Sequence, residues 1–356
     1  MSAGLVSVVI PTFNRAYCLP QALASVLDQT YRDIEIVLVD DGSTDDTRAL
    51  VDRLWGKEPR VRYIHQPNRG VSAARNLGLR TTRGAYVALL DSDDTWMPWK
   101  LEAQLACLAQ FPQAGMIWSD MEAVDADGRT ISSSYLRVMY EAYRWFTPAQ
   151  LFSSARPLAE FMESTPPALR TASVHCGEIF SQMVMGNLVH TSTALLRRSR
   201  LEQVQGFDES MRTGEDYDFH LRTCRAGPVA FLDAAAIRYS CGRADQLSRV
   251  ELRVQIARNF LRTIEPVIAR DRARIKLPDW MLARALADGH SWLGETALWA
   301  GEHAEARRHL AASLRLHPWQ PRAALLLATA LPPPATSRAL RSGLLRLKRA
   351  LRAARA

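Results

Sequence analysis

Three carboxylates lie within four residues of one another where an apolar run ends. Residues 85–90 (AYVALL) lead directly into Asp91, Asp93 and Asp94. Like charges this close repel one another, so the cluster is costly unless a positive charge is bound there. Two carboxylates at the mouth of a parallel sheet can hold a hard divalent cation and leave its other positions to water and phosphate oxygens. The spacing therefore predicts a Mg²⁺ or Mn²⁺ site that would neutralise a diphosphate leaving group.

A solvated turn is the other interpretation of the same residues. Asp94 or Thr95 could cap a helix that starts after Trp96, and the acids would then face water. Phosphate binding by a glycine loop is not indicated, since the chain contains neither GxGxxG nor GxxxxGK[ST]. A bound metal would have to take over that role.

The elements that must position these residues alternate along the first 120 residues. Apolar runs predict strands at 6–10, 34–39, 61–64, 85–90 and 114–119, and helical spacing predicts helices at 19–29, 44–54, 70–79 and 98–110. Strands separated by helices form βαβ units, so we expect an α/β fold with a mainly parallel central sheet. Polar residues follow three of the strands, at 12–15, 40–43 and 91–94. Open α/β sheets bind ligands at that edge, so these three segments should share one ligand.

The remainder of the chain is predicted to continue this domain and then to add helices. We expect one domain over residues 1–250, with a nucleotide-binding half (1–120) and an acceptor half (121–250), a helical appendage (251–330) and a tail (331–356). The pattern is weak from about 130 to 185. Residues 287–318 fit one tetratricopeptide-like helical hairpin, and a plain hairpin fits them equally well.

The formal net charge of +8 is concentrated in the carboxyl-terminal part of the sequence. Residues 306–356 contain eleven Lys or Arg and no Asp or Glu. At the end of this stretch, Leu340, Leu344, Leu347 and Leu351 form one stripe among arginines, which predicts a basic amphipathic helix. An anionic membrane surface and packing on the helical appendage are both open as its role, and we expect no nucleic-acid partner.

Composition predicts a protein of the reducing cytoplasm. The five cysteines are scattered without a CxxC pair, which argues against a disulfide framework and a zinc site. The first residues lack a basic signal-peptide region, and no run reaches the eighteen apolar residues of a spanning helix. Through its tail, the protein could be peripheral on the inner face of the membrane.

Five segments in order resemble one enzyme family. They are VSVVIPTFNR, IEIVLVDDGSTDDT, NRGVSAARNLGL, GAYVALLDSDD and GFDESMRTGEDYDFHLR. Together they resemble the family 2 inverting glycosyltransferases of the GT-A fold, over roughly residues 5–250. The resemblance implies a nucleotide-sugar donor, most often linked to UDP, with Mg²⁺ or Mn²⁺ as cofactor.

The resemblance also assigns roles to residues of this sequence. Pro11 and Thr12 would border the base, Asp41 would bind uracil with Asp40 as the alternative, and Arg75 would lie near the base. Asp91 would meet the ribose or a metal-bound water, and Asp93 would ligate the metal. The implied donor and cofactor contacts are Pro11, Thr12, Asn14, Asp40, Asp41, Arg75, Asp91 and Ser92, and the implied metal ligands are Asp93 and Asp91.

The acidic pair Glu215-Asp216 would carry the catalysis. An inverting transfer needs one carboxylate to deprotonate the acceptor hydroxyl while that oxygen attacks the anomeric carbon. In the family the pair after Gly-Phe-Asp supplies this base, which implies Asp216, with Glu215 in support and Asp218 as an alternative. The same acids could simply stabilise a helix N-terminus.

The sequence departs from the family in one respect. Many relatives carry a metal-binding His after this helix, but residues 238–243 (RYSCGR) contain none. Arg243 could substitute as a phosphate contact, whereas the Cys241 thiolate is too soft for Mg²⁺. His190 lies where relatives place acceptor-side residues, although a lone His is more often structural.

We therefore expect a metal-dependent enzyme that moves one sugar per visit from a UDP-sugar to a hydroxyl of a glycan or a lipid-linked acceptor. The processive QxxRW motif is absent, because the residue three positions before Arg144 is not Gln. A nucleotidyltransferase is less consistent with Thr12-Phe13-Asn14-Arg15, which is not a glycine-rich phosphate loop. A non-catalytic nucleotide-sugar-binding scaffold is the alternative from another class.

Overall fold

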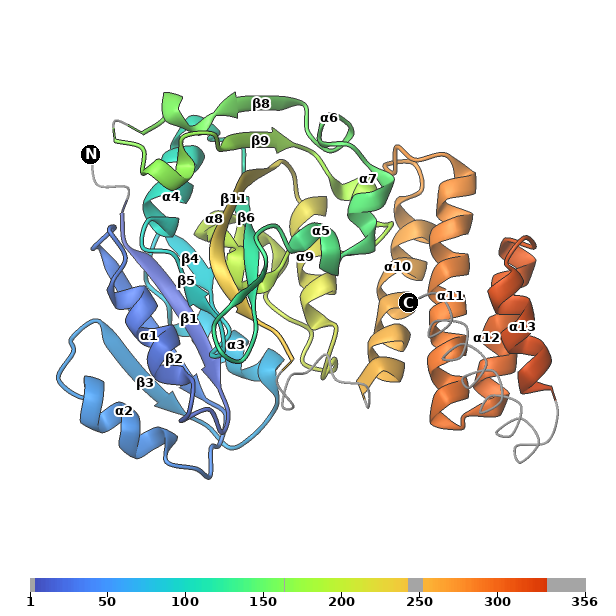
Figure 1. Ribbon diagram of the computed structural model, residues 1–356, viewed down its shortest axis with the longest axis horizontal. Helices are drawn as coiled ribbons and strands as arrows, with labels where there is room; N and C mark the ends of the chain where they lie inside the picture. Colours follow the sequence, from blue (N-terminus) through green and yellow to red (C-terminus); the bar gives the residue numbers. More distant parts are fainter. Residues whose placement is uncertain (1–3, 163, 243–251, 332–356) are drawn as a thin grey trace. The chain divides into compact units, whose positions relative to one another are not determined.

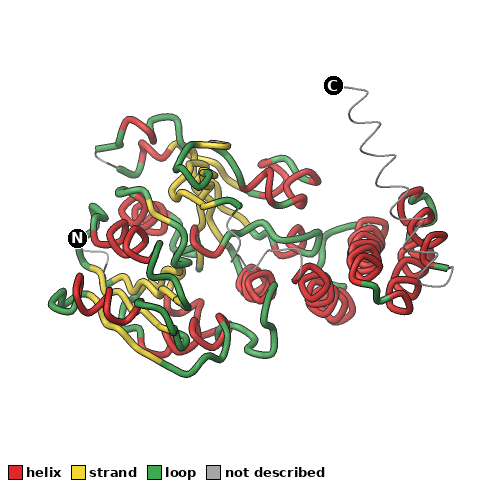
Figure 2. Tube along the Cα trace, turned by 60° about the horizontal axis from the view of Figure 1, so that its bottom comes forward, coloured by secondary structure: helices red, strands yellow, loops and turns green. Residues whose placement is uncertain are grey.

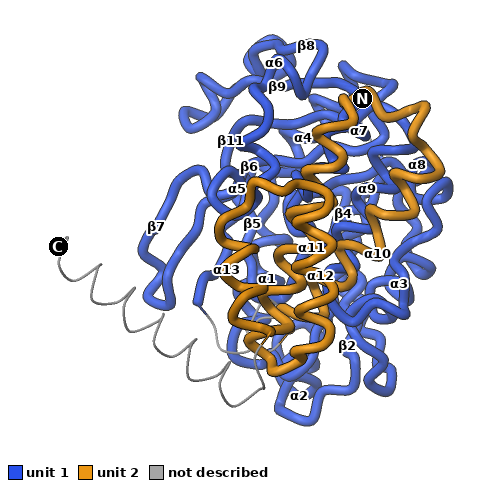
Figure 3. The backbone as a smooth tube through the Cα atoms, turned by 90° about the vertical axis from the view of Figure 1, so that its right-hand side faces the viewer, with its two compact units in different colours: residues 1–246 blue, residues 247–356 orange. Residues whose placement is uncertain are grey.

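The computed structural model describes residues 4–162, 164–242 and 252–331, and the chain divides into two compact units. Unit 1 spans Met1–Gln246 and unit 2 spans Leu247–Ala356 (Figure 3). The described strands all belong to unit 1, and the described part of unit 2 is helical (Figure 2). No helix among the described residues is long and apolar enough to cross a membrane.

The first half of unit 1 is a parallel sheet, as the sequence predicts. Its strands are β1 (Val6–Thr12), β2 (Ile34–Asp40), β3 (Val61–His65) and β4 (Tyr86–Leu89), in the order β3-β2-β1-β4 (Figure 1). All three strand pairings are parallel. The connecting helices are α1 (Leu19–Leu27), α2 (Thr47–Trp55) and α3 (Val71–Thr81). β1 and β2 are buried along their whole length, which explains their nearly continuous apolar sequence.

The strand order reverses at β1, and this reversal creates the binding edge. The chain runs outward from β1 through β2 to β3, then returns to place β4 on the other side of β1. Ligands of open α/β sheets bind at such a switch point, beyond the carboxyl ends of the strands. The segments after Thr12, Asp40 and Leu89 all emerge at this edge.

Helix α3 packs unusually close to the sheet because its sequence contains a glycine there. A Cβ added at Gly78 would lie 2.3 Å from Val9 Cγ1 and 3.4 Å from Val39 Cγ2. Val37, Val39 and Ala74 form a buried cluster at the same contact. This close packing fixes α3, and with it Arg75, relative to the strand ends.

The second half of the sheet is less parallel than the first. A short strand, β10 (Leu195–Arg197), inserts antiparallel between β4 and β6 (Met116–Val124). β11 (Val229–Ser240) runs parallel to β6 and antiparallel to β9 (Ser173–Gly177), which pairs with β8 (Ser154–Pro157). β5 (Thr95–Trp96) and β7 (Thr130–Ser132) pair antiparallel with β11 and β6.

Short helices account for the weak sequence pattern between 130 and 185. The α-helices of this half are α4 (Lys100–Gln110), α5 (Leu136–Met139), α6 (Pro148–Leu151), α7 (Phe180–Met183), α8 (Arg198–Val204) and α9 (Glu215–Arg225). The 3-10 helices are η1 (Glu141–Trp145), η2 (Leu158–Glu160), η3 (Pro167–Leu169) and η4 (Thr191–Thr193). Elements of three to five residues are too short to show a helical period.

The described part of unit 2 contains α10 (Arg253–Asp271), α11 (Asp279–Ala300), α12 (His303–Leu316) and α13 (Pro321–Ala330). The predicted hairpin corresponds to α11 and α12, whose turn contains Gly301 with a φ of 86°. A Cβ added at Gly294 would lie 2.6 Å from Leu310 Cγ, so the two helices approach closely at this glycine. The predicted amphipathic helix at 337–356 lies outside the described residues.

Candidate active site at the strand ends

Asp41 organises the nucleotide side of the edge. This buried carboxylate accepts hydrogen bonds from Gln66 Nε2 (2.6 Å) and the Arg69 N–H (2.9 Å) on Oδ1, and from the Gly70 N–H (2.8 Å) on Oδ2. Gly70 has a φ of 89° and begins α3. Asp41 therefore ties the end of β2 to the start of α3 and keeps part of its second oxygen for a ligand.

Asp40 has a more structural environment. Its carboxylate accepts the Ser43 N–H (2.8 Å) and the Tyr63 hydroxyl (2.5 Å), and its side chain is buried. Burial, reinforced by this contact, raises the pKa of Tyr63, so the phenol stays protonated and donates. Each Asp40 oxygen thus has one partner within the chain, whereas Asp41 accepts three hydrogen bonds, so the number of partners does not decide between the two acids.

Thr12 and Asn14 differ in what they offer a ligand. Thr12 Oγ1 is buried and has no hydrogen-bond partner among the described residues, so it is an unsatisfied polar group beside the binding edge. Asn14 has a left-handed backbone (φ 52°), and its Oδ1 accepts the Thr44 N–H at 2.7 Å. Asn14 thus fastens the loop after β1 to the loop after β2. Pro11 is buried within β1 and pairs with Val39.

Arg75 joins the two halves of unit 1. It donates from Nη2 to Asp91 Oδ1 and from Nη1 to Glu215 Oε1, both at 2.6 Å, and its side chain is only 4% exposed. Burial alone would lower the pKa of Arg75, but Asp91 and Glu215 raise it. The guanidinium in turn outweighs burial at Asp91 and lowers the pKa of that carboxyl. The resemblance implied that Arg75 lies near the nucleotide base. In the structure its hydrogen bonds are with Asp91 and Glu215.

Asp93 is short of positive charge. Burial, together with repulsion from Asp94 and Asp91, raises the pKa of Asp93 to about 7. Its ion-pair partner is Arg15, with Nη1 at 3.8 Å from Oδ2. A bound divalent cation would relieve this repulsion, so the acids fit a hard metal ion.

Asp94 and His190 also belong to the acidic cluster, although sequence analysis did not name them as metal ligands. Asp91, Asp94 and His190 each offer a ligand atom, and these atoms lie within 4.8 Å of one another. His190 Nε2 lies 3.4 Å from Asp94 Oδ2; burial alone would lower the His190 pKa, but Asp94 raises it. The Ser192 hydroxyl donates to Asp94 at 2.6 Å and accepts the Asp91 N–H. His190 therefore brings an imidazole to the acids from the segment between α7 and β10.

The side chains of this acidic cluster offer two possible sets of ligands for a cation. Asp94 already accepts hydrogen bonds from Ser192 and from the Ser240 N–H, the latter at 3.3 Å. Asp93 has a long ion pair and a strongly perturbed pKa instead. Asp93 with Asp91 is the pair that the sequence predicts, whereas Asp91, Asp94 and His190 are the group whose ligand atoms converge in the structure. Ser92 is buried in the same loop, and Arg243 lies outside the described residues.

The acidic pair Glu215-Asp216 begins α9 and faces this cluster. Burial raises the pKa values of both carboxyls, with Arg75 opposing the shift. Asn187 Nδ2 donates to Asp216 Oδ2 at 3.3 Å, while Asn187 Oδ1 accepts the Val189 N–H. A carboxylate with a raised pKa that is held by a fixed donor suits proton abstraction near neutral pH.

Asp218 is committed to another task. Its Oδ2 accepts both Arg222 Nε (2.9 Å) and Nη2 (2.7 Å), one helical turn further along α9. Arg222 also donates to the Val204 and Gly206 carbonyls. Asp218 therefore stabilises the packing of α9 and is not placed to act as a base.

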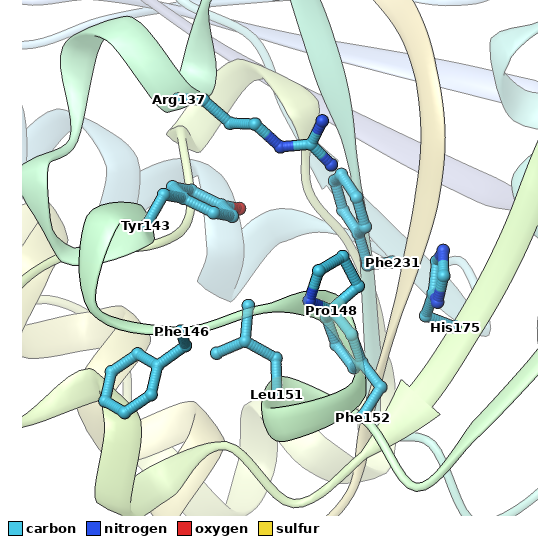
Figure 4. Close-up of a pocket in the computed structure, with 8 residues that line it drawn as sticks. All are labelled: Arg137, Tyr143, Phe146, Pro148, Leu151, Phe152, His175 and Phe231. Carbon is cyan, nitrogen blue, oxygen red and sulfur yellow. The ribbon is translucent and has the colours of Figure 1, made fainter.

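The hollows of the acceptor half lie apart from the acids. Figure 4 shows a cavity whose lining includes Tyr143, Phe152, His175 and Phe231. Its volume of about 30 Å³ holds little more than one water molecule, so it is too small for a sugar. A hollow of about 240 Å³ lies beside Trp99, Thr171 and Asp233. None of the site carboxylates lines either one.

Comparison with known proteins agrees with this geometry. Residues 7–160 match the sequence profile described as glycosyl transferase family 2. A chondroitin synthase of Escherichia coli is 30% identical over 232 residues, 64% of this chain and 28% of that protein. An uncharacterized glycosyltransferase of Rickettsia felis is 48% identical over 100 residues, 28% of this chain and 16% of that protein. The match thus spans less than a third of either relative.

Solved structures show the same fold at low sequence identity. Staphylococcus aureus TarS 1–349 in complex with UDP-GlcNAc superposes with a TM-score of 0.53 and 18% identity, covering 95% of this chain and 92% of that one. A mannosyltransferase from Pyrobaculum calidifontis in complex with GDP-Man and Mn²⁺ gives 0.51 and 19%, covering 95% and 83%. By this profile match, residues 7–160 resemble glycosyl transferase family 2, and the chain shares the fold of these two solved glycosyltransferases.

Proposed function

We propose that the protein is a metal-dependent inverting glycosyltransferase that moves one sugar from a UDP-sugar to an acceptor hydroxyl. The observation that carries the proposal is the Arg75 bridge, which places the acidic pair of α9 beside the acids after β4. A base and a diphosphate-binding group are both needed at the anomeric carbon. The proposed role lies in the synthesis of a surface glycan or glycoconjugate.

The hydrogen bonds of Asp41 support uracil as the base. Asp41 Oδ1 already accepts two N–H groups, and Oδ2 accepts one. One acceptor position therefore remains, since each carboxylate oxygen has two lone pairs. Uracil offers the single N3–H donor that this position needs, whereas guanine presents two neighbouring N–H groups along the same edge. The Thr12 hydroxyl, which is buried and has no hydrogen-bond partner among the described residues, is a second polar group at the end of β1.

Asp91 and Asp93, with Asp94 and His190 as the second choice, would hold Mg²⁺ or Mn²⁺. When bound, the ion supplies charge stabilisation for the departing nucleoside diphosphate. Neighbouring residues of the chain hold these carboxylates in place. Arg75 keeps Asp91 ionised, and Ser192 fixes the Asp91 backbone and the Asp94 carboxylate.

Asp216 is the proposed general base. As the acceptor oxygen attacks the anomeric carbon, the bond to the diphosphate breaks on the opposite face and the configuration inverts. The acceptor proton passes to Asp216, whose carboxylate is oriented by the Asn187 amide. Glu215 supports this step by holding Arg75.

The test compares Asp216→Asn with Asp218→Asn. We expect wild type to release UDP from one of a panel of UDP-sugars when acceptor glycans are added, with a product of inverted anomeric configuration by NMR. Asp216→Asn should lower kcat by about 100- to 10,000-fold, because the base is lost, while UDP binding by calorimetry is retained. Asp218→Asn loses only the Arg222 pair and should stay within a few-fold of wild type.

The same measurement separates the alternatives. A nucleotide-sugar-binding scaffold would bind UDP but show no transfer in either wild type or variant. Equal activity in wild type and Asp216→Asn would contradict the assignment of the base. A glycan or lipid-linked acceptor remains our proposal for the partner, and the proposed membrane contact through the tail concerns residues 332–356, which lie outside the described residues.

A further inference from the structure

Arg15 lies in the loop between β1 and α1, which several hydrogen bonds hold in place. The Arg15 carbonyl accepts the Cys18 and Leu19 N–H groups at 3.1 and 2.9 Å, at the start of α1. The neighbouring Ala16 N–H donates to Asp45 at 3.1 Å, and Asn14 fastens the same loop to Thr44. The backbone from which the Arg15 side chain extends is therefore fixed by contacts within the chain.

The guanidinium of Arg15 makes a weak contact with Asp93. Nη1 donates to the Tyr17 hydroxyl at 2.7 Å, and its ion pair with Asp93 Oδ2 measures 3.8 Å. A charge-assisted hydrogen bond between such groups is normally 2.7–2.9 Å long. Arg75, by comparison, contacts both of its carboxylates at 2.6 Å. The Arg15–Asp93 contact is therefore looser than either contact of Arg75.

The charge balance of the site changes when a donor binds. Asp91 is already paired with Arg75, and Asp94 lies beside His190. A nucleoside diphosphate adds further negative charge, and a metal ion on Asp93 would displace the cation that now faces it. A guanidinium suits this exchange, because its fork of donors matches phosphate oxygens.

We propose that Arg15 is a diphosphate-binding residue, which exchanges its ion pair with Asp93 for one with the donor's diphosphate. This inference rests on the proposed function and assigns Arg15 a role that sequence analysis did not give it. The competing explanation is that Arg15 only neutralises Asp93. In that case removing its charge would leave diphosphate affinity unchanged or improve it.

Calorimetry on Arg15→Gln would distinguish the two explanations. Titrations with UDP would be carried out with and without Mn²⁺, and uridine binding would be followed by ligand-observed NMR. We expect Arg15→Gln to weaken UDP binding by roughly 10- to 100-fold, because a charge-assisted contact is lost, and to leave uridine binding unchanged. The matched control is Arg32→Gln, since Arg32 is exposed at the opposite end of the sheet and donates to the Leu27 carbonyl.

Each other outcome would overturn the inference. Wild-type affinity for UDP in Arg15→Gln would show that Arg15 is only a counter-ion of Asp93. An equal loss of UDP and uridine affinity would indicate a disturbed loop. If wild type binds neither UDP nor GDP, the proposed donor class is wrong and the inference fails with it. If wild type binds UDP and Arg15→Gln binds it equally well, only the inference is refuted.

Discussion

At the scale of single residues, the site depends on how each carboxylate is paired. Asp40 is occupied by Ser43 and Tyr63, Asp218 by Arg222, and Asp91 by Arg75. Asp93, Glu215 and Asp216 have raised pKa values. The proposed function uses Asp93 as a metal ligand together with Asp91, Asp216 as the base and Glu215 as a partner of Arg75.

The metal ligand can be identified by substituting Asp93. We expect Mn²⁺ to increase the affinity of wild type for UDP. In Asp93→Asn this increase should be at least about 10-fold smaller, because one anionic metal ligand is removed. Calorimetry with and without Mn²⁺ measures it, with Asp127→Asn as the control, since Asp127 is exposed and pairs only with Arg129 among the described contacts. If His190→Gln abolishes the Mn²⁺ effect and Asp93→Asn does not, Asp94 and His190 hold the ion.

Sequence identified the acids but not their partners. Asp41, Asp91, Asp93, Glu215 and Asp216 follow from local motifs. Arg75 and Glu215 are 140 residues apart, and Asn187 and Asp216 are 29 apart, so those contacts follow only from the fold. No local signal distinguishes Asn187 from any other loop asparagine.

At the scale of elements, the predicted strands and helices of the first 120 residues are confirmed because each one carries its own signal. Nearly continuous apolar runs mark β1 and β2, and both are buried along their length. β10 has only three residues and pairs with strands far away in sequence. Neither its existence nor its antiparallel direction follows from local pattern, so the second half of the sheet could not be predicted.

The packing of α3 on β1 can be tested at Gly78. Helix propensity alone predicts that Gly78→Ala stabilises the helix by up to about 1 kcal/mol. The contact at 2.3 Å from Val9 predicts the opposite sign, a loss of about 1–3 kcal/mol from overpacking. Urea unfolding gives the sign directly. The double variant Gly78→Ala with Val9→Ala should lose less free energy of unfolding than the sum of the two single variants. Additive losses would argue against the contact.

At the scale of the whole molecule, buried ionisable groups make folding pH-dependent. His220 is fully buried, and burial lowers its pKa to about 3 from an ordinary value of 6.5. The folded protein therefore keeps this imidazole neutral while the unfolded chain takes up a proton below pH 6.5. The free energy of unfolding is therefore not reduced by this group above pH 6.5. It falls progressively as the pH decreases from 6.5 towards 3, because only the unfolded chain takes up the proton.

His220→Gln should flatten this pH dependence. Between pH 7.5 and 5, the wild-type free energy of unfolding should fall by about 2 kcal/mol more than that of the variant, because the variant lacks the proton uptake. Urea unfolding at both pH values measures the difference, and other titrating groups cancel because both proteins contain them. Parallel declines would show that His220 does not contribute.

The Arg75 bridge has a consequence for how such enzymes diversify. Arg75 and Asp91 come from the donor half and Glu215 from the acceptor half, and the three form one buried charged unit. A chimaera in which residues 121–246 came from a relative would keep the Arg75–Asp91 pair but lose the second carboxylate, unless the incoming segment supplied one at the position of Glu215. Exchange of this segment as a module therefore carries the cost of a broken buried ion pair when that carboxylate is missing.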